Sequence, residues 1–173
     1  FQSLYGTAGF KVYAEKTKNP SVVLFNNEKF ILKDNQWSPA IATRWPDYST
    51  DFYAWAPGDA VTLSADNKTF SYAVETDNEN QKDLLVARTT VREGFSGVQP
   101  VSFKHALCEV KFVASQVFIP SAVLSLKIKN VKLNGTYDFT TGNWTFPEDA
   151  EIGDITLDLS PDYNVYLSEE QWV

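Results

Sequence analysis

His105 and Cys108 carry the most versatile chemistry in this chain, and each is the single residue of its type. A histidine beside a thiol can form a nucleophile–base pair or share a metal ion. The two residues lie three positions apart, a spacing that places side chains on opposite faces of a β-strand. We therefore interpret His105 as a strand residue bonded to a neighbour, and Cys108 as a small buried apolar side chain.

Acidic residues gather in two predicted loops, one with Asp77 and Glu79 and one that runs from Glu148 to Asp154. Neither loop follows the EF-hand pattern, in which a glycine and a terminal glutamate are spaced to wrap one calcium ion. We expect both loops to be solvated, with a weak cation site as the minor alternative.

The sequence shows no nucleophile motif to complement its single histidine. A carboxylate pair for glycoside hydrolysis would have to come from residues such as Asp47, Asp51 or Glu109, and no local pattern brings these to the required separation. We predict that the protein is not an enzyme, with no catalytic residues, no metal site and no cofactor.

Aromatic residues are dense in one stretch, which contains Trp37, Trp45, Tyr48, Tyr53 and Trp55. Flat rings stack on sugars, but in β-sandwiches most large aromatic side chains fill the core. We expect Trp55 and its neighbour Phe52 to be buried. Trp45 and Tyr48 fall in a loop bounded by prolines, and they are the candidates for an exposed ligand platform.

Charge and hydropathy narrow the range of partners. The 173 residues carry a formal net charge of −7 without a basic stripe, which argues against nucleic acid and anionic membrane surfaces. No apolar run is long enough to span a bilayer. The chain begins at Phe1 and contains no methionine, so we expect a processed or excised segment.

Periodicity indicates strands rather than helices. Leu84–Ala87 is apolar on both parities, which suits a strand covered on both faces. Ala106–Phe112 alternates and predicts a half-buried strand. Asn26-Asn27 predicts a turn between strands at 22–25 and 28–33. About ten such short segments with turns between them predict an all-β sandwich.

The pattern is clearest after Pro120. Val123–Leu133 predicts a long strand, and a slip of parity at Asn130 indicates a β-bulge. Asn134-Gly135 is a strong hairpin signal, and Thr141-Gly142 predicts a second turn. Ile155–Leu159 is the last expected strand.

Several of these segments, taken in order, resemble the fimbrillin family, the Mfa-like pilus and adhesin subunits of Bacteroides-type bacteria. They are QKDLLVA at 81–87, FKHALCEVKF at 103–112, Trp45-Pro46, FYAWAP at 52–57 and the hairpin from Tyr137 to Trp144. The resemblance covers roughly Phe10 to Phe146 and fits the N-terminal domain of such proteins. Cys108 departs from it, because a small polar residue is expected there.

The resemblance implies a transthyretin-like β-sandwich over residues 1–160, with residues 161–173 as a linker or the start of a missing second β domain. It also implies an exported subunit of a fimbrium at the cell surface or outer membrane. Its membrane contact would be an N-terminal lipid anchor that is absent from this chain. Host protein or glycan would be further partners.

The resemblance also implies assembly by strand addition: many family members lose a first strand to a protease, which opens a groove that a strand of a neighbouring fimbrial subunit fills. The residues expected to line the core or that groove are Val110, Phe112, Leu124, Leu126 and Ile128. The alternative function is a carbohydrate-binding, lectin-like surface module that uses Trp45 and Tyr48.

Overall fold

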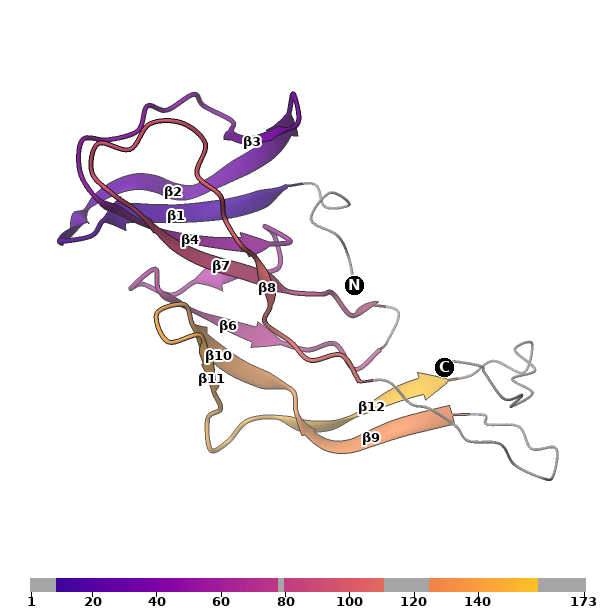
Figure 1. Cartoon of the computed structure of the whole chain (residues 1–173). Helices are drawn as coiled ribbons and strands as arrows, with labels where there is room; N and C mark the ends of the chain where they lie inside the picture. Colours follow the sequence, from indigo (N-terminus) through magenta and orange to yellow (C-terminus); the bar gives the residue numbers. More distant parts are fainter. Residues whose placement is uncertain (1–8, 78–79, 111–124, 159–173) are drawn as a thin grey trace. The chain divides into compact units, whose positions relative to one another are not determined.

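The computed structural model describes residues 9–77, 80–110 and 125–158, and every regular element within these ranges is a β-strand. Its strands divide between two compact units (Figure 1). The first unit comprises Phe1–Tyr72, Lys82–Leu107 and Gly135–Pro147, and the second comprises the segments between and after these. The predicted all-β class is confirmed. The expected domain boundary after residue 160 lies outside the described residues.

The first unit contains two sheets. The larger has the order β3-β2-β1-β4-β7-β8 and the smaller the order β11-β10-β6-β5. The larger sheet consists of β1 (Phe10–Lys16), β2 (Asn19–Lys33), β3 (Gln36–Pro39), β4 (Thr50–Ala56), β7 (Leu85–Val91) and β8 (Lys104–His105). The smaller consists of β5 (Thr62–Leu63), β6 (Thr69–Ala73), β10 (Asn134–Asp138) and β11 (Asn143–Thr145).

A core of large side chains lies between these two sheets. Trp55 of β4 is fully buried, and it meets Phe139, which follows β10, at a ring separation of 6.2 Å. Phe70 of β6 is also fully buried and packs on Tyr137 and Phe139. Rings from both sheets therefore interlock, and the predicted sandwich is confirmed for this unit.

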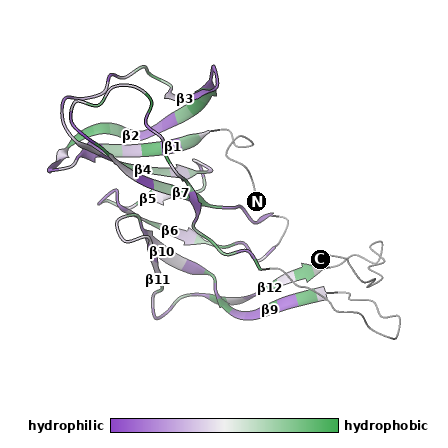
Figure 2. Cartoon of the chain, in the orientation of Figure 1, coloured by the Kyte–Doolittle hydropathy of each residue, from purple (hydrophilic) through white to green (hydrophobic). Residues whose placement is uncertain are grey.

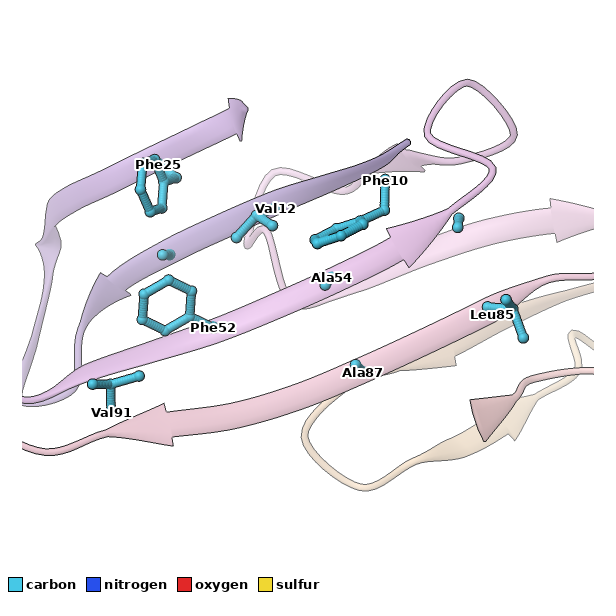
Figure 3. Close-up of a cluster of buried hydrophobic side chains, with 10 residues drawn as sticks. Phe10, Val12, Phe25, Phe52, Ala54, Leu85, Ala87 and Val91 are labelled. Atoms are coloured by element: carbon cyan, nitrogen blue, oxygen red, sulfur yellow. The ribbon is translucent and has the colours of Figure 1, made fainter. Parts of the chain in front are cut away.

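The larger sheet has a second apolar core on its opposite face. Phe10 and Val12 of β1, Phe52 of β4 and Leu85 of β7 are among its members, and Figure 3 shows them on one side of the strands. Phe95 and Phe103, two partly buried loop residues, cover this face. Because both faces are covered, every residue of β4 is buried. The doubly apolar pattern of Leu84–Ala87 is explained in the same way.

The strand predicted to break at Asn26-Asn27 is continuous. β2 runs through both residues, and the register against β1 changes from Val12↔Glu28 to Ala14↔Phe25. Asn27 has a φ of 56°, which indicates a bulge with one residue in the left-handed region. The true turns lie at the ends of β2, and Asp34 and Asn35, with φ of 49° and 60°, form the turn to β3.

The strand predicted over Ala106–Phe112 is wrong for its described part. β8 contains only Lys104 and His105, which pair with Val86 and Leu85, and residues 106–110 are not in a strand. Cys108 is exposed rather than buried. The Ala106 N–H still donates to the Leu84 carbonyl at 2.7 Å, but the segment then leaves the sheet, because alternation in sequence does not by itself provide a partner strand.

The second unit contains a two-stranded antiparallel sheet of β9 (Ser125–Lys132) and β12 (Ile152–Asp158). The hairpin predicted at Asn134-Gly135 does not form, because β9 pairs with β12 and β10 pairs with β11. The turn predicted at Thr141-Gly142 is confirmed, with Gly142 at a φ of 72°. In the described ranges there is no helix long and apolar enough to cross a membrane.

Candidate functional site

The β9–β12 sheet has one apolar face. Leu126 pairs with Leu157 across the two strands, and Ile128 pairs with Ile155. Cross-strand partners share a face, whereas successive residues alternate between faces. The apolar face therefore collects all four of these residues, and the opposite face of β9 carries Ser125, Lys127 and Lys129. Green and purple bands along β9 reflect this alternation (Figure 2).

The predicted bulge at Asn130 is confirmed, and it extends the apolar face. The register steps from Ile128↔Ile155 to Val131↔Gly153, so two residues of β9 stand opposite Asp154. Asn130 has a φ of 58°, and its backbone N–H donates to Asp154 Oδ1 at 3.2 Å. The extra residue restores the parity, and Val131 joins Ile128 on the same face.

This face is only half-buried, and the sheet is narrow. Leu126, Ile128, Val131, Ile155 and Leu157 all retain intermediate exposure. Among the residues that the structure describes, β9 is hydrogen-bonded to β12 and to no third strand, while β12 makes one parallel bridge from Thr156 to Asp77. A pair of strands is marginally stable alone in water.

The five residues predicted for the core or groove do not share one location. Leu126 and Ile128 lie together on the apolar face of β9. Val110 lies outside any strand and is 59% exposed. Phe112 and Leu124 lie outside the described residues. A role for these residues in a strand-accepting groove stays a prediction.

Trp45 and Tyr48 lie in the loop before β4, and their rings are already in contact with the protein. The Trp45 ring meets Phe52 and Phe95 at 5.8 and 5.2 Å, and its Nε1 donates to the Gly97 carbonyl at 2.8 Å. Trp45 still keeps 36% of its surface exposed. The Lys16 ammonium sits 4.9 Å from the centre of the Tyr48 ring. A sugar platform at these residues stays a prediction.

His105 is bonded to a neighbour, as expected. Its Nδ1 forms a hydrogen bond of 2.9 Å with Asp83 Oδ1 and lies equally close to Oδ2. One N–H serves one acceptor well, so Oδ2 is buried without a hydrogen bond among the described residues. Within the same ranges, no group of three or more His, Cys, Asp or Glu side chains is arranged to hold a metal ion.

An ion pair lies between the two sheets of the first unit. Glu15 of β1 is 2% exposed, and its carboxylate accepts from Tyr13 Oη at 3.0 Å and lies 2.8 Å from Lys68 Nζ. The hydrogen bond to Glu15 raises the pKa of Lys68, which keeps the ammonium charged. Burial raises the pKa of Tyr13. The pair therefore links the two sheets.

Comparison with known families identifies the chain. The model of the fimbrillin-like family matches residues 5–168, which is nearly the full length. The chain belongs to the fimbrillin-like family. The resemblance noted from the sequence is thereby confirmed, and a search of curated proteins found no match.

Two solved structures share the fold of this fimbrillin-like chain. A fimbrial protein from Bacteroides vulgatus has a TM-score of 0.61 and 16% identity, over 85% of this chain and 57% of its own. A candidate cell adhesion protein from Bacteroides ovatus has a TM-score of 0.50 and 16% identity, over 88% of this chain and 68% of its own. The fimbrillin-like chain thus spans little more than half the length of the first of these proteins.

Sequence reasoning missed three members of the apolar face, namely Val131, Ile155 and Leu157. Ile155 and Leu157 were expected in a strand, but nothing in the local pattern names β9 as their partner. The parity slip at Asn130 was the available signal for Val131, because a bulge returns the following residue to the earlier face. Pairing between strands that are distant in sequence was the missing information.

Proposed function

We propose that this fimbrillin-like chain is a non-enzymatic structural or adhesive subunit of a cell-surface fimbria, and that subunits assemble by β-strand addition. Family membership and the fold shared with a fimbrial protein support the general role. The half-buried apolar face of the β9–β12 sheet supports the mechanism. In strand addition, main-chain hydrogen bonds complete an open edge while alternate side chains cover an apolar face.

The observation that carries this proposal is the edge of β9 beside Leu126 and Ile128. An incoming strand would pair its backbone with this edge and place every second side chain beside Leu126 and Ile128. The opposite face, with Lys127 and Lys129, stays in water. Lys127 Nζ lies 3.8 Å from Asp154 Oδ2 on that polar side.

A peptide-binding experiment tests the proposal. The purified chain is mixed with a synthetic peptide that copies the C-terminal segment of the Bacteroides vulgatus fimbrial protein, or with a scrambled version. A peptide at about a hundred times its Kd stabilises a protein by about 2.7 kcal/mol. For a chain of this length, the Tm should rise by about 5–10 °C, and the scrambled peptide should leave the Tm unchanged.

Matched variants locate the binding edge. Ile128→Asp places a charge on the apolar face and should abolish the rise in Tm, whereas Lys129→Asp changes the polar face and should preserve it. The Tm of each variant without peptide shows whether the fold is retained. Equal rises in both variants, or no rise in the unmodified chain with any strand peptide, would contradict strand addition at β9.

A further inference from the structure

A second feature, within the first unit, is a hollow where the larger sheet loses its edge strand. β8 has two residues and pairs only with Leu85 and Val86, so Arg88 lies beyond the part of β7 that pairs with β8. The cavity has a volume of about 270 Å³. Its walls come from β7, β8 with the segment before it, β10 and the β10–β11 turn. The polar residues among them include Arg88, Ser102, Lys104, Tyr137 and Thr140, and Gly142 also lines the cavity.

Tyr137 brings a hydroxyl to the wall of this hollow. The residue is 4% exposed and lines the cavity. Gly142 closes the turn without a side chain, and a Cβ built there would lie 3.7 Å from Tyr137 Oη and 3.8 Å from Lys104 Nζ. One empty position is therefore close to both a hydroxyl and an ammonium group. Burial raises the pKa of Tyr137, so the hydroxyl keeps its proton and can donate at neutral pH.

The hollow is cationic on an acidic chain. Arg88 holds its guanidinium in place by donating from Nη1 to the Thr140 carbonyl at 2.9 Å, with the Tyr53 ring at 5.9 Å. Lys104 forms no ion pair with any residue that the structure describes, and no carboxylate lines the cavity. The nearest acid in sequence, Asp138, uses both oxygens to accept from Thr140 and Thr141 in its own turn.

We propose that this hollow binds the carboxylate of an acidic sugar residue. Two cations and the Tyr137 hydroxyl supply charge-assisted and neutral hydrogen bonds to the anion. Ser102 can donate to and accept from sugar hydroxyls, and Thr140 can accept from them. The volume lies just below the roughly 300–1,000 Å³ of pockets for larger ligands, which fits a single monosaccharide. An acidic peptide would instead require a basic groove that follows its repeated charges. The site does not depend on strand addition at β9.

Titrations of the ¹⁵N-labelled chain with glucuronate and with glucose test the site, because these two sugars differ by the carboxylate. Glucuronate should shift the amide signals of Ser102 and of Thr140 to Gly142, and glucose should bind at least about ten-fold more weakly, since a hydrogen bond to a charged group contributes about 1.5–3 kcal/mol. Lys104→Gln should weaken glucuronate about ten-fold or more, and Tyr137→Phe about three-fold or more. Lys33→Gln, which changes an exposed lysine of β2, should bind as the unmodified chain does.

Several outcomes would overturn the proposal. These are equal binding of glucose and glucuronate, unchanged binding by Lys104→Gln, or shifts that occur away from the hollow. Sulfate alone, if it bound as tightly as glucuronate, would show a general anion site and overturn the sugar. Tighter binding of a tetraglutamate peptide would overturn the sugar in favour of a protein partner. Tyr137→Phe removes only a hydroxyl and changes no charge, so the affinity of this variant for glucuronate can be measured even if Lys104→Gln disturbs folding.

Discussion

Glu15 carries a buried charge inside the sandwich. Its carboxylate is almost completely removed from water and has two close partners, Tyr13 and Lys68. Lys68 reaches it from the turn before β6, while Glu15 belongs to the other sheet. Breaking a buried pair by removing one partner leaves the second charge uncompensated, which costs more than the pair contributes when intact.

Lys68→Ala should therefore destabilise the protein by about 1–3 kcal/mol. This loss is smaller than the roughly 3–5 kcal/mol for removing one partner of a fully buried pair, because the Lys68 side chain is 31% exposed. Urea unfolding measures the change. In the double variant Glu15→Gln, Lys68→Ala the buried charge is gone, so part of the loss should be recovered. Additive losses in the double variant would show that the two side chains act independently.

Two β-bulges allow strands of this chain to stay paired with their neighbours when the register changes. In β2, Asn27 adopts a left-handed conformation inside a 15-residue strand and lets its two halves pair with β1 in different registers. Asn130 has the same role in β9. Asparagine tolerates this conformation better than most residues, and glycine tolerates it without steric cost.

Asn27→Val should lower stability by about 1–2 kcal/mol, because a β-branched residue is strained at positive φ. Asn27→Gly is the matched control and should stay within about 0.5 kcal/mol of the unmodified chain. Thermal or urea unfolding of the two variants separates them. Equal stabilities would mean that β2 can pair with β1 without the left-handed residue.

Three dipeptides show why the turns and strands can be predicted only in part from the sequence. Asn26-Asn27 and Asn134-Gly135 have the composition of hairpin turns, yet one is a bulge and the other begins β10. Asp34-Asn35 has similar composition and does form a turn. The same residue types allow positive φ in both settings, and the partner strand decides which is used.

For the candidate site, the alternation of apolar and polar residues correctly placed Leu126 and Ile128 on one face of a strand. It could not show that Ile155 and Leu157 lie on the same face. It also could not reveal the cationic hollow, since Arg88, Lys104 and Tyr137 come from three separate segments. The all-β class and the doubly covered strand at 84–87 followed from composition and periodicity. Long-range pairing is fixed by packing, which no short window of sequence contains.

The two units of the molecule differ in how deeply their strands are buried. Every residue of β4 is buried, whereas β9 alternates between exposed and half-buried positions. Hydrogen exchange should therefore be slowest for the amides of β4, and faster by a factor of ten or more for those of β9. Mass spectrometry or NMR of the free chain measures both. Equal protection would show that the two strands open in a single cooperative step.

The loops over the outer core also determine where the surface can be altered. Trp45 and Phe95 belong to loops, yet their rings meet each other, and Trp45 also packs on Phe52 of β4. A foreign epitope grafted beside Trp45 would therefore disrupt interior packing. The two-residue turn at Asp34-Asn35 is exposed, and its strands β2 and β3 are separated from β4 by β1. For peptide display on a subunit of this kind, the β2–β3 turn is the insertion point that leaves the core intact.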